Sequence, residues 1–251
     1  LIIGTSGRYE FKNKGIDVFL ESLNRLNRDK DLKKKVLAFV NVPSWVGDPR
    51  EDLQKRLKSK DKFTEPLQCP FITHWLHNMT HDQVLDMLKY LGMGNRPEDK
   101  VKVIFVPCYQ DGHDGILNKH YYDLILGEDL SVYPSYYEPW GYTPLESVAF
   151  RVPTITTDLA GFGLWVNSLK NQHGINDGVE VLHRSDYNYS EVADGIKDTV
   201  ALFSTKTEAE IKEIRKRAGQ VAEQALWKHF IQYYYEAYDI ALRNAMKLSL
   251  I

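Results

Sequence analysis

The chain has 251 residues, of which 43% are hydrophobic and 26% charged, and its formal net charge is −2. This profile is that of an ordinary folded protein, and it indicates neither nucleic acid nor a membrane as a partner, since no apolar run approaches the roughly 20 residues that span a bilayer. Two cysteines, Cys69 and Cys108, are too few for a disulfide framework, so we expect a cytoplasmic location.

Apolar runs alternate with amphipathic stretches along the chain. The pattern predicts strands at residues 1–6, 36–42, 101–107, 130–135, 153–157 and 179–182. It predicts helices at 15–28, 84–91 and 121–127, and only helix from residue 189 onward, with a charged stretch at 208–226 and an aromatic one at 227–248. Residues 43–77 fit neither period, and we expect loop and insertion there. The alternation predicts an α/β fold, a Rossmann-like doubly wound parallel sheet with helices on both faces and a helical C-terminal extension.

Two glutamates eight positions apart, Glu138 and Glu146, mark the most informative segment. They follow one predicted strand and precede the next, and Pro144 suits the first turn of a helix that begins near Thr143. The backbone N–H groups around Gly141 then have no partner within the helix and can receive phosphate or hydroxyl oxygens. We therefore expect the two carboxylates to bracket a polyhydroxylated, phosphorylated ligand.

Four segments in the same order carry a resemblance to a known family. They are GRYEFKNKGIDVF at 7–19, KVIFVP at 102–107, YPSYYEPWGYTPLE at 133–146 and TTDLAGFG at 156–163. The third resembles the E-x7-E motif of retaining glycosyltransferases with the GT-B fold, and its WGYTP spelling resembles glycogen synthases of the animal and fungal type. Because E-x7-E alone is a weak signal, the assignment depends on the four segments together.

The resemblance implies a domain organisation and a reaction. Residues 1–205 would be the Rossmann-like domain that binds the nucleotide sugar, and residues 206–251 would be helices that pack on it. The chain opens directly on a strand, so we expect it to be the C-terminal half of the enzyme. The implied substrate is UDP-glucose, used without cofactor or metal to extend α-1,4-glucans. The glucan acceptor would bind through the missing N-terminal half, without which we expect the chain to be inactive; a homo-oligomer stays open.

Basic and aromatic residues acquire roles from the same resemblance. Arg8 and Lys14 match positions that contact the diphosphate, where a fork-shaped and a point-like cation together stabilise a leaving group without metal. The alternative is a solvated basic turn. Tyr121 matches an aromatic that stacks on uracil, although Tyr122 beside it makes a core tyrosine an equal alternative.

The E-x7-E segment receives the remaining roles. Glu138 would face the glucose and support positive charge at its anomeric carbon, and Glu146 would accept hydrogen bonds from the ribose. Thr143 would reach a phosphate. The backbone N–H groups that would hold the glucose hydroxyls belong to Trp140, Gly141 and Tyr142.

Other chemistry-bearing residues favour structural roles. His74, His77 and His81 have spacings that suit zinc, and residues 111–114 (DGHD) also suggest a metal, but neither group has cysteine partners. Cys108 has no evident histidine partner for nucleophilic catalysis, so we interpret it as structural. The glycines at 161 and 163 are typical of a loop that closes over the ligand, or of an ordinary connection.

Two rivals and one departure from the family remain. The chain could belong to a different GT-B transferase that uses ADP-glucose or another sugar nucleotide, or to a non-catalytic nucleotide-sugar-binding module. Glycogen synthases of the resembled type carry an arginine cluster on a late helix that receives glucose 6-phosphate. The corresponding stretch here has only Arg215 and Arg217, so we expect no activation by that sugar phosphate.

Overall fold

A six-stranded sheet organises the computed structural model, which describes residues 1–170 and 172–248. Its strands are β1 (Ile2–Ser6), β2 (Val36–Asn41), β5 (Val101–Val106), β6 (Leu130–Tyr133), β7 (Thr154–Thr157) and β8 (Val179–Leu182). Every neighbouring pair is parallel, in the order β5-β2-β1-β6-β7-β8. Numbered within the sheet, this is the 3-2-1-4-5-6 order of doubly wound nucleotide-binding folds, so the predicted fold class is confirmed.

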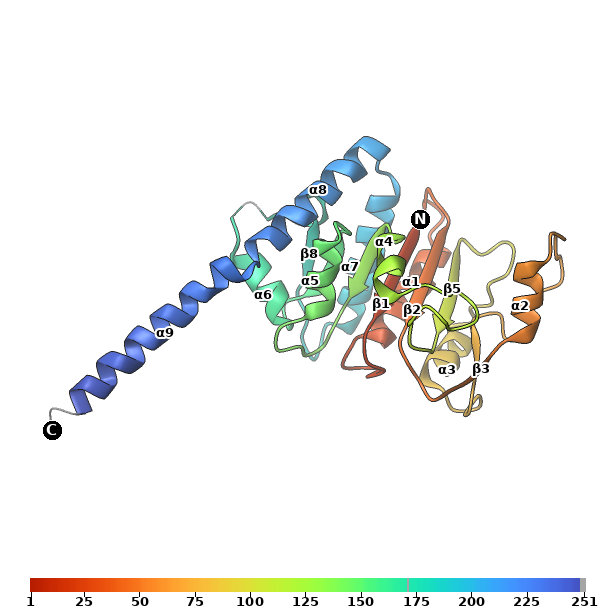
Figure 1. The fold of residues 1–251 in the computed structure, drawn as a ribbon. Helices are drawn as coiled ribbons and strands as arrows, with labels where there is room; N and C mark the ends of the chain where they lie inside the picture. The colour runs from red at the N-terminus through yellow and green to blue at the C-terminus, as the bar shows by residue number, and fades with distance from the viewer. Residues whose placement is uncertain (171, 249–251) are drawn as a thin grey trace.

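Helices lie on both faces of this sheet (Figure 1). They are α1 (Ile16–Arg28), α3 (Gln83–Tyr90), α4 (Tyr121–Leu126), α5 (Tyr142–Ala149), α6 (Gly161–Ser168), α7 (Tyr189–Ser204) and α8 (Glu208–Gln224), with a short 3-10 turn η1 (Ile175–Asp177). The last helix, α9 (Trp227–Leu248), follows α8. One buried apolar cluster joins α1, α3 and α7 to the sheet, and a second joins α5, α6 and α8. Two separate cores therefore hold the two helical layers.

Helix α1 shows how the sequence brings two loops together. Its apolar residues, among them Phe19 and Leu23, fall on one buried face. The residue before the helix, Gly15, has φ 67°, and a Cβ there would lie 2.0 Å from the carbonyl oxygen of Pro134. Only glycine therefore lets the β1–α1 loop approach the end of β6 so closely. These two loops flank the point where the strand order reverses.

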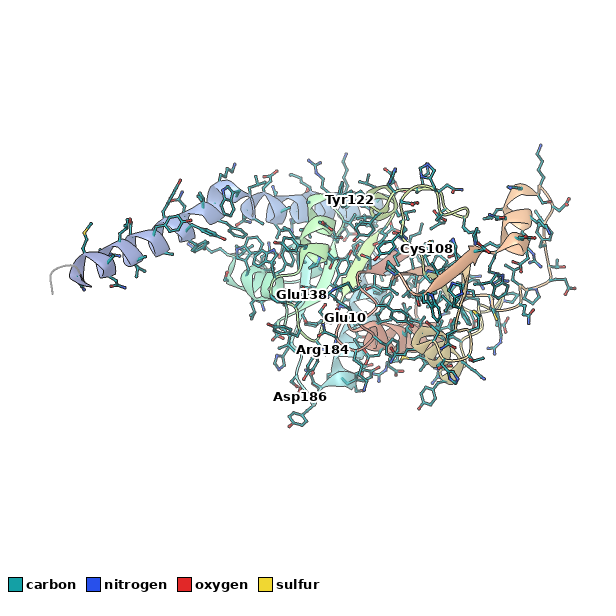
Figure 2. The ribbon with its side chains drawn as sticks, turned by 60° about the horizontal axis from the view of Figure 1, so that its bottom comes forward. Glu10, Cys108, Tyr122, Glu138, Arg184 and Asp186 are labelled. Carbon is teal, nitrogen blue, oxygen red and sulfur yellow. The ribbon has the colours of Figure 1, made fainter. Side chains whose placement is uncertain are left out.

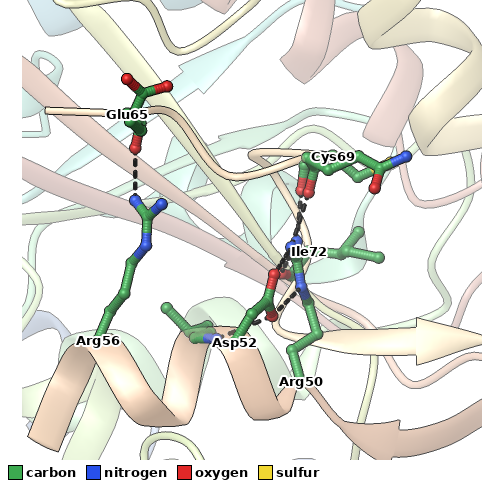
Figure 3. Close-up of polar contacts among 8 residues, drawn as sticks. Arg50, Asp52, Arg56, Glu65, Cys69 and Ile72 are labelled. Atoms are coloured by element: carbon green, nitrogen blue, oxygen red, sulfur yellow. Dashed lines mark hydrogen bonds and ion pairs between the residues drawn. The ribbon is translucent and has the colours of Figure 1, made fainter. Parts of the chain in front are cut away.

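Residues 43–77, where we expected loop and insertion, contain short regular elements as well as irregular segments. They contain β3 (Val46–Pro49), α2 (Glu51–Lys58) and β4 (His74–Leu76), with β3 and β4 antiparallel. Helix α2 buries no residue, and the unit is organised around the fully buried Arg50. This guanidinium binds Asp52 at 2.6 Å and the carbonyls of Gln68 and Cys69 at 2.7 and 2.6 Å (Figure 3). Ile72 and Leu76 belong to the main apolar cluster, whereas next to α2 an internally paired charge takes the place of apolar packing, which hydrophobic periodicity cannot detect.

The two last helices differ in how they meet the domain. Helix α8 packs along α5, whereas α9 extends away from the body of the molecule (Figure 1). Near the start of α9, Phe230 contacts the rings of Trp140 and Trp165, with centroids 5.4 and 5.6 Å away. Its later aromatic residues, such as Tyr233 and Tyr238, are exposed. The expected packing of the C-terminal helices on the domain thus holds for α8 and the start of α9. The domain boundary at residue 205 stays a prediction.

Two smaller points complete the fold. Residues 171 and 249–251, which belong to the predicted units 1–205 and 206–251, lie outside the described residues. Among the helices that are described, none combines the length and the apolar character needed to cross a bilayer.

Candidate functional site

A cleft of about 530 Å³ opens at the carboxyl ends of β1, β2 and β5. Its lining residues are Ser6, Gly7, Arg8, Tyr9, Asn41, Pro43, Cys108, Tyr109, Gln110, Asp111, Tyr121 and Thr143. The cleft adjoins the switch point between β1 and β6, where doubly wound sheets bind ligands, and its volume suits a small molecule. Of the predicted site residues, Arg8, Tyr121 and Thr143 lie on its wall.

Tyr121 is held in place by a chain of polar contacts. Its hydroxyl is 2.7 Å from Oγ of Ser6, and its backbone N–H donates to the carbonyl of Gln110 at 3.1 Å. The Gln110 amide in turn donates to Oδ1 of Asn41 at 2.9 Å. Burial raises the pKa of Tyr121 to about 12, so the phenol stays neutral. A fixed, neutral aromatic ring at the cleft wall is what stacking on a planar base requires.

The N-terminus of α5 is open. The helix begins at Tyr142, as predicted, after Gly141 with φ 111°, and no side chain caps it. The backbone N–H groups of Trp140, Gly141 and Tyr142 donate to no acceptor within the described residues. Thr143 in the first turn lines the cleft. The helix therefore presents unpaired N–H donors and the positive end of its dipole beside the cleft.

The N-terminus of α6, in contrast, is already occupied. Gly161 donates its N–H to the carbonyl of Glu138 at 3.0 Å, and Phe162 donates to that of Trp140 at 2.6 Å. The expectation of a loop closing over the ligand is therefore wrong, because residues 161–163 form the first turn of this helix. Its function in the fold is to fix the backbone from which Glu138 projects.

Lys14 and Glu138 form an ion pair across the switch point. Lys14 comes from the β1–α1 loop and Glu138 from the β6–α5 loop, and their side chains are only 14% and 19% exposed. Arg8 instead pairs with Glu10 at 2.9 Å, and its side chain is 76% exposed. The two predicted phosphate contacts therefore occupy different environments, and their roles stay predictions.

The second glutamate of the motif has a separate neighbour. Glu146 lies one turn into α5, and Tyr122 donates a hydrogen bond to its Oε1 at 3.2 Å. Burial raises the pKa of the Glu146 carboxyl, and the Tyr122 hydroxyl opposes that rise. Glu146 does not line the cleft. Figure 2 labels Tyr122 and Glu138 together with Cys108 of the cleft wall.

The side chains of Trp140 and Tyr142 are not among those that line the cleft. The Trp140 indole packs in an aromatic cluster with Phe162, Trp165 and Phe230, at centroid distances of 6.2, 5.8 and 5.4 Å. Tyr142 is 72% exposed. The predicted contacts of these two residues therefore depend on their backbone N–H groups, as the sequence argument assumed.

One group of potential metal ligands exists within the described residues, and it differs from the sets that the sequence suggested. His74, Cys108 and Asp114 bring their ligand atoms within 4.8 Å of one another. Both ring nitrogens of His74 already have partners, since Nε2 is 2.7 Å from the Asp114 carbonyl and Nδ1 is 2.9 Å from Oγ1 of Thr73. Burial, assisted by Asp114, raises the pKa of Cys108 to about 11, which keeps the thiol protonated. The His74 ring and the Asp114 carboxylate are thus engaged in hydrogen bonds, and a structural role fits the group.

Sequence reasoning missed much of the cleft wall. Asn41 directly ends β2, and residues 108–111 follow β5. Because ligands bind at the carboxyl ends of parallel strands, polar residues at those two strand ends were a usable signal.

Solved structures share this architecture. The pneumococcal O-GlcNAc transferase GtfA, solved in complex with UDP and GlcNAc, is 13% identical and matches 96% of this chain and 36% of its own, with a TM-score of 0.51. An α,α-trehalose-phosphate synthase (UDP-forming) from Burkholderia vietnamiensis is 11% identical and matches 97% of this chain and 43% of its own, with a TM-score of 0.53. Identities this low show the fold alone, which is that of the GT-B glycosyltransferases.

The chain belongs to the glycogen synthase family, whose sequence model matches residues 1–48 and 49–249. The glycogen [starch] synthase of Neurospora crassa is 28% identical over 98% of this chain and 42% of its own length. The chain thus spans less than half the length of the curated relatives it matches. The aligned stretch of 301 residues exceeds the 251 of the chain. The family match divides between residues 48 and 49, within β3.

Proposed function

We propose that this chain is the UDP-glucose-binding side of a retaining glucosyltransferase that extends α-1,4-glucans. The observation that carries the proposal is the open N-terminus of α5 beside a cleft lined by Arg8 and Tyr121. Membership of the glycogen synthase family supports it, and so does UDP in the descriptions of two proteins with the same fold. A cytoplasmic location and independence of metal belong to the proposal.

In this mechanism the chain acts by electrostatics. The uracil stacks on Tyr121, the ribose bonds to Glu146, and the diphosphate lies against Arg8 and the first turn of α5. The acceptor hydroxyl attacks the anomeric carbon on the face from which UDP departs. Its oxygen forms the new glycosidic bond, the bond from that carbon to the phosphate oxygen breaks, and the hydroxyl proton passes to the departing phosphate. Arg8, Lys14 and the helix dipole stabilise the charge that develops on UDP, and Glu138 stabilises that on the sugar.

UDP binding and glucose transfer are expected to require different parts of the complete enzyme. All the residues assigned to UDP-glucose are present in it, whereas relatives are more than twice as long. We propose that the main acceptor site lies in the part of the complete enzyme outside this chain. The purified chain is then expected to bind UDP and to transfer no glucose to glycogen.

Calorimetry of the chain with UDP and ADP in EDTA tests the proposal. We expect UDP to bind more tightly than ADP. Arg8→Ala and Glu146→Ala should each lower the affinity for UDP by at least about tenfold. That loss corresponds to a hydrogen bond that involves a charged group, roughly 1.5–3 kcal/mol.

Asp186→Asn serves as the matched control for those variants. Asp186 is exposed in the loop after the edge strand β8, away from the cleft (Figure 2), and its replacement should leave UDP affinity unchanged. Tighter binding of ADP would favour a transferase with another nucleotide sugar. Binding that needs a divalent cation would contradict metal independence, and no nucleotide binding at all would contradict the site.

Glucose 6-phosphate is expected to have no effect on this protein. The two arginines of α8 are already engaged, Arg215 with the Glu128 carbonyl and the Asp129 carboxylate, and Arg217 with Asp177 at 2.9 Å. A phosphate would have to displace these partners. Thermal unfolding of the chain with millimolar glucose 6-phosphate should therefore match that with glucose. A rise in Tm specific to the phosphate, which would report binding to the folded state, would contradict this expectation.

A further inference from the structure

A second hollow, of about 240 Å³, lies beside the cleft. It forms where the segment before β3 meets the end of β4 and the start of α3. Tyr9 lines both the cleft and the hollow, and the adjacent residues Pro43 and Ser44 line one each. The two spaces therefore share a wall.

The floor of the hollow is rigid. The hydroxyl of Tyr9 donates to Oδ2 of Asp82 at 2.8 Å and accepts from the Val84 N–H at 3.0 Å. Oδ1 of Asp82 accepts from the N–H groups of Val84 and Leu85, both at 3.0 Å, and so caps α3. Leu76 completes the floor and is buried. These contacts engage both carboxylate oxygens in holding the start of α3, so the Asp82 side chain is fixed by the fold.

Trp45 stands at the rim with an open ring face. It is 74% exposed, the most exposed of the five tryptophans. Its orientation is nevertheless defined, because the His77 ring lies 4.8 Å away at 41° and the His77 N–H donates to the Trp45 carbonyl at 3.1 Å. Trp75 of the neighbouring strand differs, since the Arg50 guanidinium covers its ring at 4.5 Å. Trp45 therefore has the His77 ring beside it and leaves most of its own surface open.

The remaining rim is polar and carries no cation. His81 and Gln83 are exposed, and their side chains make no hydrogen bond to any described residue. Asn78 accepts one hydrogen bond from Thr80 at 3.2 Å and keeps its amide N–H groups free. Neither Lys nor Arg is among the residues that line the hollow. A phosphorylated ligand would find no counter-charge here, whereas a neutral polyol would find an apolar ring and several hydrogen-bonding groups.

We propose that this hollow is a subsite for a neutral saccharide, a segment of α-glucan beside the bound UDP-glucose. A sugar ring would place its C–H face on Trp45, while Asn78, His81 and Gln83 bond its hydroxyls. The choice of α-glucan as occupant rests on the proposed function. The shared Tyr9 wall sets the segment next to the cleft, so part of the acceptor contacts this half of the enzyme.

Calorimetry of the chain with maltoheptaose, with UDP titrated into parallel samples, tests the subsite. We expect the wild-type chain to bind maltoheptaose. Trp45→Ala should lower the affinity for maltoheptaose roughly tenfold or more, as loss of an aromatic anchor does. UDP affinity should stay the same, which also shows that the variant is folded. Tyr90→Ala is the matched control, since Tyr90 is an 87% exposed aromatic on α3 outside the hollow. It should bind maltoheptaose as wild type does.

The outcomes separate the subsite from the proposed function. Wild-type chain that binds UDP but no maltoheptaose overturns the subsite alone. Equal maltoheptaose affinities for wild type and Trp45→Ala overturn it as well, because the saccharide then binds elsewhere. Failure of wild type to bind UDP is a failure of the proposed function, and it is read from the other titration.

Discussion

Replacement of Lys14 by methionine is expected to lower the free energy of unfolding by roughly 2–3 kcal/mol. The ion pair with Glu138 is largely buried, with 14% and 19% of the side chains exposed. Removing one partner leaves the other charge without compensation in a place that water barely reaches, whereas removing both does not. The double variant Lys14→Met/Glu138→Gln should therefore be clearly more stable than Lys14→Met. Denaturant unfolding of the single and double variants measures the difference.

The exposed pair of Arg8 and Glu10 provides the control. Arg8 is 76% exposed and its partner 32%, so Arg8→Met should cost less than about 1 kcal/mol. The same variants separate folding from function. If Lys14 also contacts the diphosphate, the double variant regains stability without regaining UDP affinity. Equal stabilities for the single and double variants would contradict a coupled ion pair.

Local signals predicted the α5 segment, and long-range contacts determined the rest of the site. The helix start beside Thr143 was readable because glycine, proline and the motif spacing all act within a few residues. The contact of Lys14 with Glu138 joins positions 124 residues apart, and the close approach of Gly15 to the carbonyl of Pro134 brings their two loops together. Neither periodicity nor composition carries that information.

Residues 43–77 show a different limit of sequence reasoning. Their helix α2 has no buried residue, and their centre is a charged side chain bound to backbone carbonyls. A pattern search for apolar periods finds nothing to detect there. The second hollow depends on the same unit, since Trp45 precedes β3 and Leu76 ends β4. Because the elements of residues 43–77 were not predicted from the sequence, the candidate subsite that they form was not predicted either.

Stability is expected to fall by about 3 kcal/mol between mildly acidic and mildly basic pH because of Glu128. This side chain is 4% exposed. Oγ of Ser131 donates to its Oε2 at 2.6 Å, and Ser147 of α5 donates to Ser131 at 2.8 Å. Arg215 contacts the backbone carbonyl of Glu128 and not its carboxyl group. Burial therefore raises the pKa of Glu128 to about 7 from its ordinary value of 4.5.

The sign follows from which state holds the proton. Between pH 4.5 and about 7 the folded chain keeps a proton on Glu128 that the unfolded chain releases, so each step upward in pH favours unfolding. Above about pH 7 the loss is complete and the contribution of Glu128 becomes constant.

Glu128→Gln, a neutral side chain of nearly the same shape, should remove this dependence. Urea unfolding at several values from about pH 5 to pH 8 should then show wild type losing stability relative to the variant. Asp123→Asn, at an exposed carboxylate on α4, should leave the wild-type profile unchanged. Parallel profiles for wild type and Glu128→Gln would mean that Glu128 is already ionised in the folded chain.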